Sequence, residues 1–287
     1  CRQMGIKIMP PDINKGEGSF SVDEDGIRYG LIAIKGLGKP VIDAIISERN
    51  ANGQFKTLKD LTERLSGKEI NKRTLESMIK AGALDSLVGN RRQKMQVYVQ
   101  IIDAVNEEKK QAITGQMSLF DFVGEEDKSA LDVPYPDLDE YDKDTLLAFE
   151  KEVLGIYVSG HPIEEYEQVW RRNITNTSLD FVVDTQEEDS DKPSKLNDKQ
   201  ECIIGGMISN KTVKVTKNNT MMAFITVEDM FGSVEVIIFP RDYERIKDKL
   251  IKDSKVFIKG RVALEEEKDA KVILTGIAPF DNVRRDV

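Results

Sequence analysis

The chain has 287 residues, of which 39% are hydrophobic and 32% charged, and its formal net charge is −9. This length allows two or three compact domains. No uninterrupted apolar run is long enough to cross a bilayer, so we expect a cytoplasmic protein with no membrane partner. Two cysteines, Cys1 and Cys202, and one histidine, His161, are too few and too scattered for a Cys/His zinc site. We therefore expect no metal site.

The charge is unevenly spread along the chain. Residues 28–110 carry 16 Lys and Arg against 10 Asp and Glu, whereas residues 121–200 carry 8 against 22. Residues 201–280 are nearly neutral, with 13 against 12. A basic segment inside an acidic chain indicates contact with phosphate more strongly than the overall pI of about 5.0 argues against it.

Residues 28–90 show the apolar spacing of successive amphipathic helices. The stretches "KPVIDAIISERN", "TLKDLTERL" and "NKRTLESMIK" each predict one helix. Pro40 suits a first turn, and Thr57 and Asn71 suit the N-cap position. A further helix is predicted over residues 91–110.

Two glycine-containing breaks separate these helices, "AIKGLGKP" and "MIKAGALDSL". We expect Gly36 and Gly38 to adopt positive φ and to leave bare N–H groups at the start of the next helix, where the helix dipole favours an anion. Paired breaks of this kind predict a tandem helix-hairpin-helix that binds duplex phosphates without reading bases, although one break alone is more typical of an ordinary helix–helix turn. The candidate duplex-binding residues are Lys35, Gly36, Leu37, Gly38, Lys39, Lys80 and Gly82.

Residues 91–127 combine the helix with the stretch "TGQMSLFDF", in which Leu119, Phe120 and Phe122 fit neither a helix face nor a strand face. Residues 128–200 are acidic, and we expect them to form a linker with one short helix at "TLLAFEKEVLGIYV" and a turn at "SGHP". His161 lies in that turn without a nucleophile or carboxylate in register. It is therefore interpreted as a structural residue rather than a general base.

Residues 201–280 contain five β-rich runs with a helical stretch, "RDYERIKDKLI", after the third run. That order predicts an OB-fold, a five-stranded barrel that binds single strands through basic loops and exposed aromatic rings. For each Phe, a place in the barrel core is the alternative. Residues 281–287 form a tail. The candidate single-strand residues are Lys211, Lys214, Lys217, Phe224, Phe231 and Arg241.

The chain lacks a phosphate-binding loop of the P-loop or Rossmann pattern, and it lacks a nucleophile–base–orienter set. No catalytic residue is assigned, and the sequence indicates a protein that binds rather than catalyses. The fold class expected is multidomain α+β: a tandem helix-hairpin-helix, a linker with an apolar peptide, and an OB-fold.

Five stretches in this order resemble the C-terminal half of the bacterial DNA polymerase III alpha subunit of the DnaE type: "MGIKIMPPDIN", "YGLIAIKGLG", "MIKAGALDSL", "EKEVLGIYVSGHP" and "IIGGMIS". The resemblance implies that residues 1–27 end the fingers domain and that the chain is part of a longer polypeptide. It also implies a palm domain upstream, where catalytic aspartates use Mg²⁺ and deoxynucleotides. The chain itself is expected to need no cofactor and to incorporate no nucleotides.

The same resemblance gives "TGQMSLFDF" a role. Gln116, Met117, Ser118, Leu119 and Phe120 match the Q-x-x-L-F peptide by which the family docks on the β sliding clamp. Duplex DNA, single-stranded DNA, the clamp, the clamp loader and other replisome subunits are the partners implied.

Two other interpretations remain open. One is a complete DNA-binding or repair module, as in NAD-dependent ligases, which however place the OB-fold before the hairpins. The other is an RNA-binding OB protein, which the hairpin pair disfavours.

Overall fold

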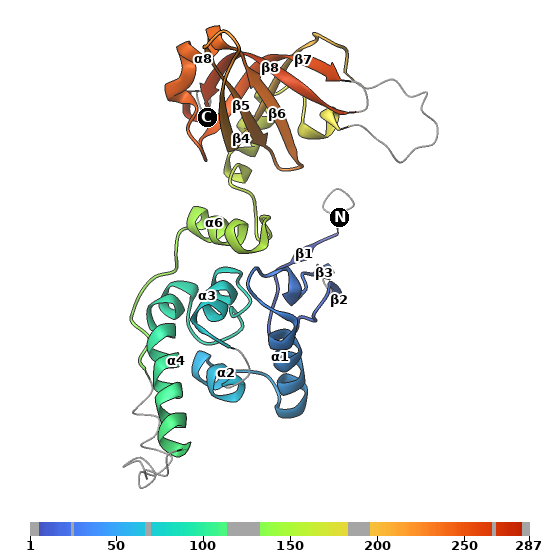
Figure 1. The fold of residues 1–287 in the computed structure, drawn as a ribbon. Helices are drawn as coiled ribbons and strands as arrows, with labels where there is room; N and C mark the ends of the chain where they lie inside the picture. Colours follow the sequence, from blue (N-terminus) through green and yellow to red (C-terminus); the bar gives the residue numbers. More distant parts are fainter. Residues whose placement is uncertain are drawn as a thin grey trace. The chain divides into compact units, whose positions relative to one another are not determined.

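The computed structural model describes residues 6–23, 26–66, 70–113, 133–182, 196–265 and 268–282. The chain divides into two compact units, residues 1–160 and 161–287. Figure 1 shows the elements of each unit. The candidate clamp peptide, Gln116–Phe120, lies outside the described residues.

A small sheet opens the first unit. Its strands are β1 (Ile8–Met9), β2 (Ser21–Asp23) and β3 (Gly26–Arg28), in the order β1-β3-β2. The buried Arg28 guanidinium donates to Asp23 and to the carbonyl of Pro10. Ile13, between β1 and β2, is fully buried in the same core as the helices that follow.

The helical part follows the sequence pattern closely. The short 3₁₀ turn η2 spans Leu31–Ala33, and the helices are α1 (Lys39–Asn52), α2 (Leu58–Leu65), α3 (Lys72–Lys80), α4 (Arg91–Ile113) and α6 (Lys143–Leu154). Thr57 and Asn71 cap α2 and α3 by accepting hydrogen bonds from the N–H groups of Asp60 and Thr74, as predicted. Helix α4 packs on α2 and α3, and α6 packs on α3 (Figure 1).

The second unit is built on a closed barrel. Its strands are β4 (Glu201–Val215), β5 (Met221–Glu228), β6 (Ser233–Ile238), β7 (Lys255–Glu265) and β8 (Lys268–Pro279), in the order β4-β5-β6-β8-β7. Helix α8 (Pro240–Ile246) and the 3₁₀ turn η7 (Lys247–Lys249) follow β6. Five strands with a helix after the third confirm the predicted OB-fold, and the helices before it confirm the predicted fold class.

Residues 161–182 pack on this barrel. They form η5 (Glu164–Tyr166), α7 (Glu167–Asn173) and η6 (Ser178–Phe181). Trp170 is fully buried beside Phe257 and Phe280, and its Nε1 donates to the carbonyl of Gly205 at 2.7 Å. His161 is buried, and its Nδ1 accepts from the N–H of Ile163, which agrees with a structural role.

The short helix expected within residues 128–200 corresponds to α6, but the description of residues 133–182 as a linker is wrong. Helix α6 contributes Val153 to the core of the first unit, and Trp170 and Phe181 are buried in the second unit. Scattered apolar residues in an acidic segment were enough to fold it against the two cores. Within the described residues, no helix is long and apolar enough to span a membrane.

Gly205 gives a direct test of how Trp170 is seated on the barrel. A Cβ at Gly205 would lie 2.7 Å from the Trp170 ring and 3.0 Å from that of Phe257. We expect Gly205→Ala to lower the unfolding free energy of the second unit by about 1–3 kcal/mol, because the rings must move.

Gly276→Ala is the matched control, since its Cβ would meet only the Lys259 side chain at an ordinary 3.8 Å. Urea unfolding followed by Trp170 fluorescence measures both variants. Equal decreases of stability in the two would contradict the packing described.

Candidate nucleic-acid interface

The first hairpin, residues 34–39, joins η2 to α1. Gly36 has φ +86°, so it adopts the left-handed conformation predicted for the turn. Gly38 does not: its φ of −79° is extended, because it serves as the N-cap residue of α1. The Leu37 side chain is buried in the helical core, whereas Gly36 and Gly38 on either side of it are exposed.

The start of α1 is open to an anion. Gly38 supplies no side-chain cap, and the first turn contains no acidic residue. Lys39 is exposed, and so are both glycines of the hairpin. Lys35 lies on the other side of the turn, where its Nζ donates to the carbonyl of Glu152 at 2.9 Å. A helix N-terminus with two lysines beside it attracts phosphate.

The second hairpin, residues 80–91, presents its predicted residues differently. Gly82 has φ +75° but is buried under the guanidinium of Arg91, and a Cβ there would lie 2.2 Å from Arg91 Nη2. Lys80 makes ion pairs with Glu76 at 2.9 Å and Glu152 at 2.8 Å. Burial acts to lower the pKa of Lys80, but its hydrogen bonds to Glu152 and Glu76 raise it above the ordinary value. The two hairpins thus meet α6 through Lys35 and Lys80.

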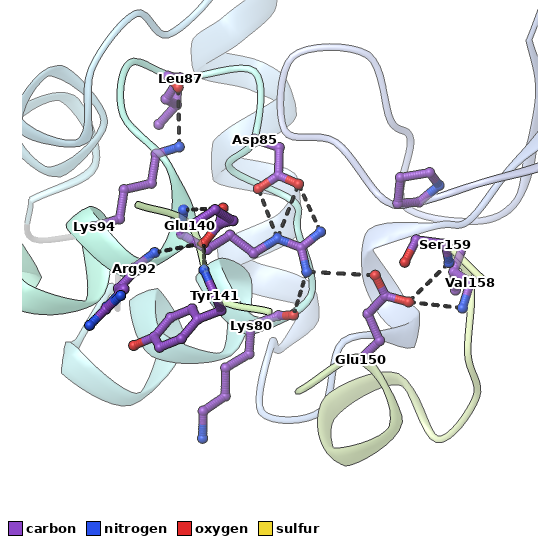
Figure 2. A network of polar contacts seen from close by, with 12 residues as sticks. Lys80, Asp85, Leu87, Arg92, Lys94, Glu140, Tyr141, Glu150, Val158 and Ser159 are labelled. Atoms are coloured by element: carbon purple, nitrogen blue, oxygen red, sulfur yellow. Dashed lines mark hydrogen bonds and ion pairs between the residues drawn. The ribbon is translucent and has the colours of Figure 1, made fainter. Parts of the chain in front are cut away.

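A buried ion-pair network fixes the second hairpin to α6. The Arg91 guanidinium reaches Asp85 at 2.7 Å and the fully buried Glu150 at 3.5 Å. The other oxygen of Glu150 accepts from the N–H groups of Val158 and Ser159, both at 3.0 Å, as Figure 2 shows. One arginine and one glutamate therefore join the hairpin, α6 and the turn after it.

Lys94, one turn further along α4, is also used internally. Its side chain is fully buried, and its Nζ donates to the carbonyls of Leu87 and Gly89. Burial lowers the pKa of this amine. The contact closes the loop between the hairpin and α4 (Figure 2).

On the barrel, the structure brings together only some of the predicted single-strand residues. Lys214 on β4 lies over the Phe224 ring on β5, with Nζ 5.0 Å from the ring centre. Lys217 is exposed in the turn that joins these strands. Lys211, by contrast, donates to the carbonyl of Leu250 at 2.9 Å and so helps to seat the end of η7.

Phe231 lies away from this group, in the turn between β5 and β6. Its ring centre is 6.1 Å from that of Trp170, and its side chain is 38% exposed. The pairing of Ala223 with Ile238 places the start of α8, and hence the exposed Arg241, at the same end of β5 as Lys217. Phe231 follows the opposite end of β5, so Arg241 can join a basic surface with Lys214 and Lys217 whereas Phe231 cannot.

Sequence reasoning missed the polar residues that hold these surfaces in place. Arg91 and Glu150 look like ordinary helix charges, and only their burial reveals their role. Asp229 is also buried, and it accepts from the N–H and hydroxyl of Ser178 and the N–H groups of Phe231 and Gly232. The sequence "EDMFG" marks a turn at Asp229 but does not indicate its distant partner.

Comparisons with known proteins agree with both folds. The family described as "Helix-hairpin-helix motif" matches residues 5–94, and that described as "OB-fold nucleic acid binding domain" matches residues 202–279. The first match includes most of residues 1–27. Their assignment to the end of a fingers domain stays a prediction.

Three relatives have sequences that align with nearly the whole of this chain. DNA polymerase III subunit alpha of Borreliella burgdorferi is 35% identical over 95% of this chain and 23% of that protein. The subunit of Saccharopolyspora erythraea is 34% identical over 98% and 23%, and that of Thermus aquaticus is 34% identical over 93% and 20%. The chain thus spans 20–23% of these relatives, less than the half that its motifs suggested.

Among solved structures, the SSB domain of a Synechococcus sp. protein matches 27% of this chain and 91% of that chain, with 17% identity and a TM-score of 0.25. A mitochondrial single-stranded DNA binding protein from S. cerevisiae, Rim1, matches 29% and 95%, with 13% identity and a TM-score of 0.25.

The Arg91 network predicts that two glutamates of α6 differ sharply in importance. Glu150→Ala should destabilise the first unit by about 3–5 kcal/mol, because Arg91 would keep a buried, partly unpaired charge. Glu152→Ala should cost at most about 1 kcal/mol, since Glu152 is 57% exposed. Thermal and urea unfolding measure both, and a small effect of Glu150→Ala would contradict the network's importance.

Proposed function

Because the chain is homologous to the C-terminal region of DNA polymerase III alpha subunits, we propose that it is the DNA-binding and clamp-binding part of a replicative DNA polymerase. The observation that carries this proposal is the order of modules, a helix-hairpin-helix followed by an OB-fold, within an alignment that covers 95% of the chain. Template-directed synthesis then belongs to the longer protein. The proposed role in bacterial replication implies that the protein acts in the cytoplasm.

In this proposal, the first hairpin binds the backbone of the duplex. The start of α1 supplies the N–H of Lys39 and the positive end of the helix dipole, since Pro40 has no N–H and that of Val41 donates to the carbonyl of Gly38. Lys35 and Lys39 add charge on either side. These groups recognise phosphate and carry no base-reading chemistry. A polymerase must hold duplex of any sequence, and this site suits that need.

The barrel is proposed to bind single-stranded template. Phe224 offers a ring for stacking, and Lys214, which lies over that ring, offers charge to the backbone. Lys217 and Arg241 extend the positive surface at the same end of β5. The near-neutral balance of residues 201–280 predicts modest affinity, which suits a template that must slide.

A stand-alone repair module is the second candidate function, because hairpins and an OB-fold also occur together in ligases. The order of modules and the alignment with alpha subunits favour the polymerase. Among the described residues, no cluster of three His, Cys, Asp or Glu side chains could hold a metal ion. In this proposal, the Mg²⁺ and deoxynucleotides are bound by the upstream palm domain that the resemblance implies.

The hairpin proposal predicts that charge reversal at Lys35 and Lys39 weakens duplex binding. For each phosphate that the variant no longer neutralises, the slope of log affinity against log salt should become shallower by about 0.9, because fewer counterions are released. Fluorescence anisotropy with a labelled duplex at several salt concentrations gives both quantities.

Lys56→Glu is the control for this experiment. Lys56 is exposed, and it follows the far end of α1, about 20 Å from Lys39 along the helix axis. If Lys56→Glu changed the slope as much as Lys39→Glu, the hairpin would have no special role. Unfolding curves should show that the Lys35 variant, which can no longer donate to the carbonyl of Glu152, remains folded.

The clamp proposal predicts that Leu119→Ala with Phe120→Ala abolishes binding to the β sliding clamp and leaves duplex affinity unchanged. Two adjacent apolar anchors carry most of such a small interface. Phe122→Ala, two residues beyond the motif, should bind nearly as well as the unaltered chain. Calorimetric titration with the clamp measures all three, and unchanged affinity in the double variant would exclude the motif.

A further inference from the structure

The two hairpins differ in what occupies the start of the helix that follows them. At α4, the carboxylate of Glu140 accepts from the backbone N–H of Arg91 at 2.9 Å and from that of Arg92 at 3.1 Å. A carboxylate that accepts two N–H groups at a helix N-terminus takes the position that a phosphate would take. Figure 2 shows Glu140 lying against Arg92 and Tyr141.

Glu140 is held there by a folded segment, the strap (residues 133–142). The Asn90 side chain donates to the carbonyl of Leu138 at 2.7 Å, and that of Gln93 donates to the carbonyl of Pro136 at 2.8 Å. Tyr135 of the strap packs on the core of the first unit. These contacts attach the strap to the first turn of α4, and they hold Glu140 beside the N–H groups of Arg91 and Arg92.

The other groups that could serve a phosphate at the second hairpin are used internally as well. Lys80 pairs with Glu76 and Glu152, and Arg91 pairs with Asp85 and Glu150. Gly82 is covered by Arg91. Gly82, Lys80 and Arg91 are therefore not exposed to a phosphate in the way that Gly36, Gly38 and Lys39 are in the first hairpin.

At α1 the corresponding position has no such occupant among the described residues, and it offers the N–H of Lys39 alone because Pro40 has none. Gly38 provides no side-chain cap, and the first turn of α1 contains no carboxylate. Lys39 stands exposed beside it. The same motif thus has an open helix start in one copy and a filled one in the other.

We propose that only the first hairpin binds the duplex backbone, and that the second has become a structural joint whose anion position is filled by the chain's own Glu140. This inference rests on the proposed function of the hairpins in duplex binding. Glu140 excludes phosphate there both by occupying the two N–H groups and by like-charge repulsion. The joint serves to hold α6, and α6 in turn supports Lys35 of the first hairpin.

Amide chemical shifts of the unaltered chain test the inference without any variant. During titration with a short DNA duplex, the amides of Gly38 and Lys39 should shift, while those of Arg91 and Arg92 should stay in place. Shifts of equal size at all four would overturn the inference but support the proposed function. Shifts at neither hairpin would overturn both.

A matched set of neutralised side chains gives the second readout. Lys39→Gln should weaken duplex binding several-fold and reduce the salt slope by about 0.9. Arg92→Gln, in the first turn of α4, should match the control Lys56→Gln in both quantities. Lys39 and Lys56 are exposed and Arg92 is half-buried, and unfolding curves establish that each variant is folded. An effect of Arg92→Gln as large as that of Lys39→Gln would overturn the inference.

Discussion

The first unit depends on one buried ion-pair network. Arg91 lies between Asp85 and Glu150, and Glu150 also accepts from the N–H groups after α6. A pair of charges removed from water is stable only while its geometry is kept, so the network tolerates one arrangement of the hairpin and α6. Because Lys35 hydrogen-bonds to the carbonyl of Glu152 on α6, the network also determines how the first hairpin is presented.

The local charge of each surface differs from the net charge of the whole chain. Several acidic residues contact the basic helical part. Glu140 accepts from the N–H of Arg91, and Glu150 and Glu152 form ion pairs with Arg91 and Lys80. Lys39 at the first hairpin and Lys214 and Lys217 at one end of the barrel are exposed. An acidic protein can thus present basic surfaces to DNA, and local charge is the better guide to its partners.

Local features were predictable from the sequence, and long-range ones were not. The N-caps at Thr57 and Asn71, the Gly36 turn and the five strands follow from nearest-neighbour chemistry. The roles of Lys80 and Arg91 depend on Glu152 and Glu150, which lie about sixty to seventy residues away in the chain, beyond the reach of any periodicity rule. The linker prediction failed for a related reason: acidic composition indicates solvation, but one tryptophan and a few aliphatic residues are enough to dock a segment.

In the proposed function, one chain joins a duplex-binding module to a single-strand-binding module. Competition titrations of the intact chain with a blunt duplex, a single strand, and a junction joining the same two parts test it most directly. The junction is expected to bind more tightly than either part, because the second contact becomes intramolecular. A junction that binds no more tightly than its better part would contradict the proposed function.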